Sequence, residues 1–249
     1  MKTFDPSETA TIVAGWTDAH VYSPAPRHRR RLMLAWLKSL KFSSLLDAGC
    51  AHADFLRALA PTTTTAQLYG CDICRELMEY NSAHISGITF ATVDLTQEPF
   101  PGVAHFDMVV TSEVLEHIED WQLALRNLLT YSKRFVLVTV PAGPRYAIDR
   151  RIGHFKHYTI EEVTAVVEAG GFRVVRARYW GFPFHSLYKW SINAFSPDRI
   201  YTAFGEKSYG PFKKGFCHLL YALFYLNDLF PSSGGQLLLL AERTKPLET

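Results

Sequence analysis

Glu113, Glu116 and His117 are residues whose types and spacing could do chemistry. If a helix begins at Glu113, spacings of three and four residues place all three side chains on one face. Two carboxylates so close repel each other unless something positive lies between them, and a divalent cation would serve. A neutral histidine can also accept a hydroxyl proton near pH 7. The trio therefore predicts a metal site or a general base; a solvated first turn of a helix is the alternative.

Two further histidines, His154 and His157, are the next candidate bases. They lie just before a helix that is predicted over residues 160–169, because Thr159 and Glu162 form a capping box. The alternative interpretation is that both histidines only order the loop that leads into this helix.

The stretch at residues 45–55 predicts the element that positions a ligand. An apolar strand ends in Asp47, small residues follow, and a helical pattern begins near Phe55. A strand that turns sharply into a helix points backbone N–H groups at a ligand, and small residues let the ligand approach closely. Ala51 and Ala53 occupy two of the small positions. If either needs a positive φ, it is strained by about 1 kcal/mol or more.

Asp72 closes the second predicted strand, where a carboxylate can accept the ribose hydroxyls of an adenosine. The same contact serves NAD, so Asp72 alone does not choose between cofactors. The dinucleotide fingerprint would need a small residue at position 54, and Asp54 stands there instead. A cofactor without a pyrophosphate is therefore the better prediction.

These stretches together resemble the class I methyltransferases that depend on S-adenosylmethionine (SAM). Residues 47–53 resemble motif I, acid-x-Gly-x-Gly-x-Gly, with alanine at two glycine positions. Residues 106–118 resemble motif IV and its extension in the methyltransferases that include the ubiquinone-pathway O-methyltransferases. Residues 153–159 and 170–172 are two further family-like phrases. The resemblance covers residues 43–180 well and residues 182–230 poorly.

The resemblance implies SAM as cofactor and a set of contacts to it. Asp94 resembles the motif III acid that contacts the adenine amino group, although Asp47 and Asp94 could simply cap the turns after their strands. The implied contacts are Asp47, Gly49, Cys50, Ala51, Asp72, Ile73, Asp94, Leu95, Thr111 and Ser112.

The spacing of Glu113, Glu116 and His117 also resembles the metal site of the small-RNA 2′-O-methyltransferases. In that site a later histidine completes the set, and His154 or His157 could take its place here. Related SAM enzymes carry a very similar phrase without an obvious need for metal. A divalent cation is therefore a second, conditional cofactor prediction, with a plain protein base as the alternative.

The alternation of predicted strands and helices indicates an α/β fold, doubly wound and Rossmann-like. We expect a seven-stranded, mostly parallel sheet with an antiparallel last strand and a helical aromatic insertion before it. The whole chain, 1–249, is predicted to form a single domain. Its parts are an N-terminal helical region (1–42), a SAM-binding core (43–181), an aromatic lid (182–233), and the last strand with its tail (234–249).

Within the aromatic segment, residues 216–226 form a helical pattern that is apolar on both sides, and such a helix is expected to be buried. We expect the segment at 182–230 to be a lid over the substrate, with a membrane anchor as the alternative. It is also where a homodimer could form.

The composition describes an ordinary globular protein. With 48% hydrophobic residues, 20% charged residues and a net charge of +2, the chain gives no reason to expect a nucleic-acid partner. The basic run at 27–31 is interpreted as a solvated helix start in preference to a phosphate or membrane patch. Four cysteines, read as reduced thiols, and no secretory or bilayer-spanning pattern lead us to expect a cytoplasmic protein.

The sequence therefore predicts SAM-dependent methyl transfer to a small, apolar or aromatic molecule, at a hydroxyl oxygen. A non-catalytic scaffold with the SAM fold, or a membrane-associated protein, is the alternative. An NAD(P)-dependent dehydrogenase is the weaker alternative.

Overall fold

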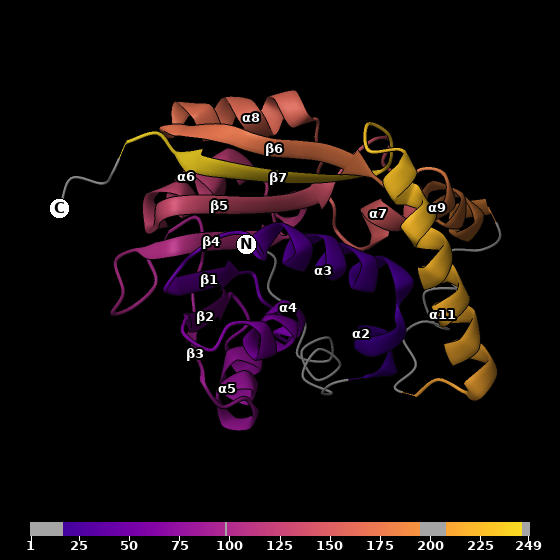
Figure 1. Cartoon of the computed structure of the whole chain (residues 1–249), viewed down its shortest axis with the longest axis horizontal. Coiled ribbons are helices and arrows are strands. Elements are labelled where there is room, and N and C mark those ends of the chain that lie inside the picture. Colours follow the sequence, from indigo (N-terminus) through magenta and orange to yellow (C-terminus); the bar gives the residue numbers. More distant parts are fainter. Residues whose placement is uncertain (1–16, 98, 195–207, 246–249) are drawn as a thin grey trace.

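The computed structural model describes residues 17–97, 99–194 and 208–245. Within them, seven strands form one sheet in the order β3-β2-β1-β4-β5-β7-β6 (Figure 1). Strands β1 to β5 pair in parallel, and β7 is antiparallel to both β5 and β6. This confirms the predicted doubly wound sheet and its antiparallel last strand. The strands are β1 (Ser44–Ala48), β2 (Gln67–Asp72), β3 (Ile88–Thr92), β4 (Phe106–Ser112), β5 (Ser132–Pro141), β6 (Phe172–Trp180) and β7 (Gln236–Arg243).

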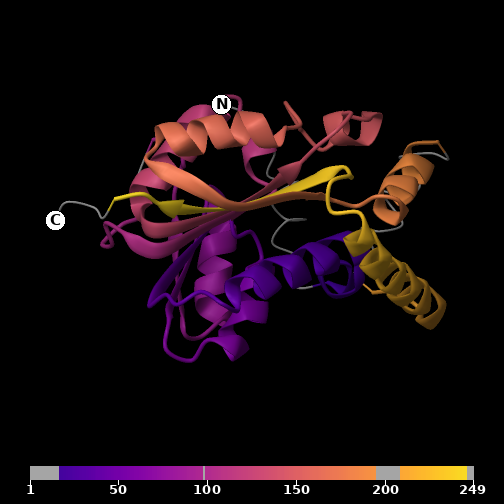
Figure 2. The same cartoon turned by 45° about the horizontal axis from the view of Figure 1, so that its top comes forward.

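Helices cover both faces of the sheet (Figure 2). Helices α3, α4 and α5 pack on one face, and α6 and α8 pack on the other. The predicted capping box of α8 is confirmed, because Thr159 Oγ1 accepts a hydrogen bond from Glu162 N and Glu162 Oε2 accepts one from Thr159 N. The helices are α2 (Asp18–Tyr22), α3 (Pro24–Leu37), α4 (Asp54–Leu59), α5 (Arg75–His84), α6 (Trp121–Tyr131), α7 (Ala147–Arg151), α8 (Ile160–Ala169), α9 (Phe184–Ala194) and α11 (Pro211–Phe224), with 3₁₀ turns η1 (Ala60–Thr62), η2 (Leu115–His117) and η3 (Tyr225–Leu229).

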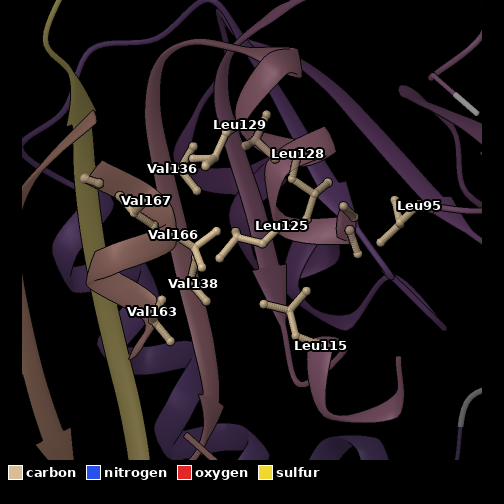
Figure 3. Close-up of a cluster of buried hydrophobic side chains, with 14 of the residues drawn as sticks. Leu95, Leu115, Leu125, Leu128, Leu129, Val136, Val138, Val163, Val166 and Val167 are labelled. Atoms are coloured by element: carbon tan, nitrogen blue, oxygen red, sulfur yellow. The ribbon is translucent and has the colours of Figure 1, made fainter. Parts of the chain in front are cut away.

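The central strands are apolar on both faces, because side chains alternate between two cores. Val136 and Val138 of β5 face the leucines of α6 and the valines of α8 (Figure 3). Their neighbours Phe135 and Leu137 face the opposite core, under α3 and α4. With both faces covered, the carboxyl edge of the parallel strands is where a doubly wound sheet binds its ligand.

The N-terminal helices pack against the segment that was predicted as a lid. The guanidinium of Arg27 lies 3.9 Å from the ring centre of Tyr221, and that of Arg31 lies 4.0 Å from the ring centre of Tyr225. Arg31 also forms an ion pair with Asp228 in η3. These cation–π and ionic contacts join α3 to α11 and η3, which are far from it in the sequence.

The prediction that the helix near residues 216–226 is buried on all sides is wrong. Helix α11 buries Cys217 and Phe224, whereas Phe212 is 89% exposed and Leu219 is 58% exposed. Residues 195–207, which belong to the predicted lid, lie outside the described part of the chain. Cys50, Cys71, Cys74 and Cys217 are all free thiols.

None of the described helices combines the length and the apolar character that a membrane crossing requires.

Candidate active site

The loop between β1 and α4 has the strand–turn–helix form that the sequence predicts. Gly49 has a φ of 80°, and a Cβ on it would lie 2.2 Å from a methyl carbon of Val114, so only glycine fits. Ala51 and Ala53 have φ values of 44° and 59°. Both alanines therefore carry the left-handed strain that their substitution for glycine implies.

Replacing Ala51 with glycine should raise the free energy of unfolding by about 0.5–1 kcal/mol. Ala51 is exposed, so the change relieves about 1–2 kcal/mol of strain, less about 0.4–1 kcal/mol for the freer unfolded glycine. Ala53→Gly is the matched control, because the Ala53 methyl is fully buried and its loss costs about 0.8 kcal/mol. Urea unfolding measures both variants. Equal gains in stability would contradict this account.

A cavity of about 140 Å³ lies between this loop and α3. The residues that line it include the acids Asp47 and Asp54 and the bases Arg29 and Arg30. Groups of both signs suit a zwitterion, such as the amino-acid end of SAM. The side chains of Arg29 and Arg30 are only 18% and 16% exposed, so the interpretation of the run at 27–31 as a solvated helix start is wrong for them. The predicted cofactor residues in the wall are Asp47, Gly49, Cys50, Ala51 and Ser112.

Asp47 is buried at the base of this cavity. Burial raises the pKa of Asp47 to about 8, and the Asp72 and Asp54 carboxylates raise it as well. The folded protein therefore keeps a proton on Asp47 over a range, from about pH 4 to about pH 8, in which the unfolded chain has lost it. Stability falls as the pH rises through that window, because the native state binds more protons than the unfolded state.

We expect Asp47→Asn to flatten the loss of stability between pH 7 and 8.5, because the substitution removes this titration. The measurement is the free energy of unfolding in urea at several pH values in ligand-free protein. Asp107→Asn is the control: the pKa of Asp107 lies below its ordinary value, so its contribution falls at acid pH. Parallel curves for wild type and Asp47→Asn would show that Asp47 does not titrate in this range.

Asp72 is the last residue of β2, and Ile73 follows it at the carboxyl edge of the parallel strands. Asp72 Oδ2 accepts a hydrogen bond of 3.1 Å from Ala51 N, and Oδ1 accepts one of 3.1 Å from Cys74 N. These backbone donors fix the carboxylate, and each oxygen retains a lone pair for a hydroxyl group. The adjacent Ile73 is 55% exposed and offers an apolar surface beside the carboxylate.

The remaining predicted cofactor residues, Asp94, Leu95 and Thr111, also lie outside the cavity wall. Asp94 Oδ1 accepts a hydrogen bond of 2.9 Å from Thr96 N, so this carboxylate caps the turn after β3. The side chain of Leu95 packs in the core. Thr111 is fully buried, which contradicts a direct cofactor contact. Side chains alternate along β4, and its neighbour Ser112 lines the cavity instead.

Glu113 does not start a helix, so the premise that placed it on one helical face with its neighbours is wrong. Its φ is 57°, and only the single 3₁₀ turn η2 follows. Glu113 Oε2 lies 3.3 Å from Nη1 of Arg29, and Oε1 accepts a hydrogen bond of 3.2 Å from Thr139 Oγ1. Glu113 therefore joins Arg29 in the cavity wall to Thr139 at the carboxyl end of β5.

Glu116, His117 and His154 form a cluster in which one ligand atom from each residue lies within 4.8 Å of the others. Phe155 N donates a hydrogen bond of 2.7 Å to Glu116 O, which ties the histidine loop to η2. Glu116 is fully buried, and neither of its carboxylate oxygens has a hydrogen-bond partner among the described residues. Burial and the nearby Glu113 raise the pKa of Glu116. A buried carboxylate in this state needs a proton or a cation.

The tautomer of His154 follows from its contacts. His157 Nδ1 lies 3.2 Å from the carbonyl oxygen of Gly143, which can only accept, so Nδ1 carries the proton. His157 Nε2 then accepts the proton of His154 Nδ1, at 3.2 Å. The unprotonated His154 Nε2 faces Glu116 Oε1 at 4.0 Å. Desolvation lowers the pKa of His154 to about 4, so its lone pair is free at neutral pH.

Asp149 continues this series of contacts to a second pocket, of about 160 Å³. Asp149 Oδ2 lies 3.6 Å from His157 Nε2, and Oδ1 lies 3.0 Å from Lys189 Nζ. Gly143 and Lys189 both line the pocket, which is bounded by the carboxyl end of β5, α9 and the chain before β7. The predicted lid segment thus contributes α9 to a pocket wall.

Sequence reasoning missed Arg29, Asp149 and Lys189. Asp149 and Lys189 are 40 residues apart and meet only because α7 and α9 are neighbours. Neither residue belongs to a sequence motif whose spacing would indicate a functional site. Arg29 had a signal, since it lies in the basic run, but the run was interpreted as solvated.

Residues 20–177 match the family model described as a methyltransferase domain, which covers more than half of the chain. No curated protein matches the chain.

Three solved structures illustrate the fold. Magnesium protoporphyrin IX methyltransferase from Synechocystis PCC 6803, with bound SAH, is 16% identical, and the match covers 88% of this chain and 85% of that chain, with a TM-score of 0.53. A Haloferax volcanii complex of the Trm112 methyltransferase activator with a putative methyltransferase is 15% identical. That match covers 89% of this chain and 91% of that chain, with a TM-score of 0.59. N-methyltransferase NodS from Bradyrhizobium japonicum WM9, in complex with S-adenosyl-L-homocysteine, is 25% identical. That match covers 62% of this chain and 79% of that chain, with a TM-score of 0.50.

Proposed function

Because this chain belongs to the methyltransferase-domain family and has the class I SAM-dependent methyltransferase fold, we propose that it methylates a hydroxyl oxygen of a small molecule. The observation that supports this proposal is one series of contacts at the carboxyl edge of the sheet. At one end, Arg29 in the cavity wall pairs with Glu113, whose charge acts on Glu116 and His117 of the buried cluster. At the other end, close contacts run from His154 of the cluster through His157 and Asp149 to Lys189 in the second pocket. The series links a donor site to an acceptor site through groups that can hold a proton.

The donor site fits SAM, the cofactor of this family. The cavity holds groups of both signs for an amino-acid end, and the fixed carboxylate of Asp72 is available for ribose hydroxyls. Ile73 offers its exposed side chain to the adenine. Bound SAM supplies an electrophilic methyl group on a sulfonium. The chain's own residues hold and orient the donor, and they exclude water from the acceptor. The family assignment and this site favour SAM over NAD(P).

On the acceptor side, His154 is the residue we propose to receive the hydroxyl proton. Its Nε2 lone pair is free, and His157 and Gly143 fix the orientation of its ring. His117 lies beside it at the exposed rim, with ring centres 4.8 Å apart, and is the alternative base. His157 uses both ring nitrogens in hydrogen bonds, so it orients His154 and leaves the base role to its neighbours.

As the alternative to a protein base, we propose that Glu116, His117 and His154 hold a divalent cation, which would occupy the Nε2 lone pair of His154. The two unpartnered carboxylate oxygens of Glu116 favour this site over one that includes Glu113. A cation there would lower the pKa of a nearby hydroxyl group. Metal analysis and equilibrium dialysis with Mn²⁺ or Zn²⁺ test it: Glu116→Gln should abolish binding, and Glu113→Gln should retain it. Full methyl transfer in excess chelator by protein without bound metal would leave the histidines as plain bases.

The function is tested by labelled-SAM transfer to fractionated metabolites and by calorimetry of SAM binding. Asp72→Ala should weaken SAM binding about 30-fold, because a carboxylate that accepts hydroxyl protons contributes about 2 kcal/mol. Asp107→Ala is the matched control. It removes a carboxylate that accepts a 2.7 Å hydrogen bond from Ser43 N at the opposite end of β4. SAM binding without transfer to any fraction would instead support a non-catalytic scaffold.

A further inference from the structure

Helix α11 presents an apolar stripe on its outer side. Phe212, Phe216 and Leu219 are exposed at spacings of four and three residues, which places them on one helical face. The stripe continues into η3, where Leu226 is 44% exposed and Leu229 is 71% exposed. The opposite side of α11 is occupied, because Cys217 and Phe224 are buried and Arg27 stacks on Tyr221.

Helix α9, which contacts α11, also carries exposed apolar side chains. Its Leu187 and Trp190 are 58% and 53% exposed, one helical turn apart. Both views place α7, α9 and α11 at the same end of the molecule (Figures 1 and 2). Ser186 and Lys189 of α9 line the second pocket, so exposed apolar residues and pocket residues alternate along one helix.

The net charge at this end is positive. Arg150 and Arg151 of α7 are exposed, and Lys213 and Lys214 lie in the first turn of α11. Within the described α7, α9, α11 and η3, the acids are Asp149, which is buried and paired with Lys189, and Asp228, which is bound by Arg31 and Arg178. Asp18 of α2 forms an ion pair with Lys214, at 2.9 Å. The acids nearby are therefore neutralised within the protein, and Arg150, Arg151 and Lys213 give an excess of positive charge beside the apolar stripe.

We propose that α9, α11 and η3 dock this protein on the surface of an anionic lipid bilayer. An apolar helical face with exposed phenylalanine and leucine side chains, bordered by lysine and arginine, is typical of helices that lie in the bilayer interface. The 14 residues of α11 extend about 21 Å, and one side is packed against α3, so the helix lies in the plane of the surface. Docking in this way places the α9 wall of the second pocket beside the lipid. The inference goes beyond the proposed methyl transfer and is tested without it.

Vesicle co-sedimentation of the full chain is the test. The probes are vesicles of phosphatidylcholine alone and of phosphatidylcholine with about one-third phosphatidylglycerol. We expect binding to the anionic vesicles at physiological salt, at least about tenfold weaker binding to the neutral ones, and weakening as salt is raised. Absence of binding to the anionic vesicles overturns the proposal.

Paired variants assign the surface. Phe212→Ser combined with Leu219→Ser should reduce partitioning at least about tenfold. Val175→Ser changes an equally apolar residue that is 48% exposed on β6, and it should leave partitioning unchanged. All these side chains are exposed, so the thermal midpoints should match wild type. Equal partitioning of the paired variant overturns the proposal. A dimer in light scattering that the paired variant abolishes, without lipid binding, assigns the face to a second copy of the chain.

Discussion

Replacing Glu116 with methionine should stabilise the protein in chelator and abolish methyl transfer. Both carboxylate oxygens of Glu116 are buried and without hydrogen-bond partners, a state that costs about 1–3 kcal/mol. An apolar side chain of similar volume removes that cost. The same change deletes a metal ligand and the group that faces His154 Nε2 at 4.0 Å, so we expect methyl transfer to fall at least about 100-fold.

Two measurements separate these effects: urea unfolding with excess chelator, and labelled-SAM transfer to the acceptor fraction. Glu162→Ala is the opposite control, because Glu162 caps α8 through Thr159 and has no contact with the cluster. It should lose about 1 kcal/mol of stability and keep its activity. A Glu116→Met protein that is less stable than wild type and fully active would make Glu116 a structural residue.

The parts of the fold that the sequence predicted are those that local rules decide. The capping box at Thr159 and Glu162 needs only a spacing of three residues, and the structure has both of its hydrogen bonds. The strain at Ala51 and Ala53 follows from a turn geometry that the neighbouring residues already indicate. The alternation of strands with helices predicted a mostly parallel, doubly wound sheet, and the structure confirms it.

The predictions that failed concern the direction in which a side chain points, or depend on residues far away in the sequence. In β4 both faces are apolar, so alternation did not reveal that Ser112 faces the cavity and Thr111 the core. A helix that is apolar all round does not indicate which side packs, and α11 turns Phe212 outward. Glu113 was placed on a helix because spacing says nothing about its φ of 57°.

In the candidate site, too, the sequence predicted what local spacing decides and missed what long-range contacts decide. The sequence named Glu116, His117 and His154, but in a set with Glu113, because local spacing favours the nearest carboxylate. The cluster in the structure contains Glu116, His117 and His154 without Glu113, which is held by Arg29, a residue 84 positions earlier in the chain. Long-range pairing of this kind leaves no periodic signal in a single sequence.

His157 should control which nitrogen of His154 carries the proton. In the present arrangement His157 Nε2 accepts from His154 Nδ1 and leaves Nε2 of His154 as the free lone pair. His157→Phe removes that acceptor, so His154 is free to take the other tautomer. We expect a 10- to 100-fold loss of kcat, of about the size seen when partners that orient a histidine are removed. Nitrogen-15 NMR shifts of the imidazole rings report the tautomer independently of activity.

His154→Gln should reduce kcat at least about 100-fold, because it removes the lone pair itself. In the wild type, desolvation holds the pKa of His154 at about 4. The base is therefore deprotonated from pH 6 upward, and kcat at saturating SAM should fall only as the pH drops through about 4, well below the usual histidine value of about 6.5. His84→Gln is the control, because this histidine bonds to Tyr80 O on α5, outside the cluster. A limb that survives in His154→Gln, below the usual histidine value because burial also lowers the pKa of His117, would transfer the role of base to His117.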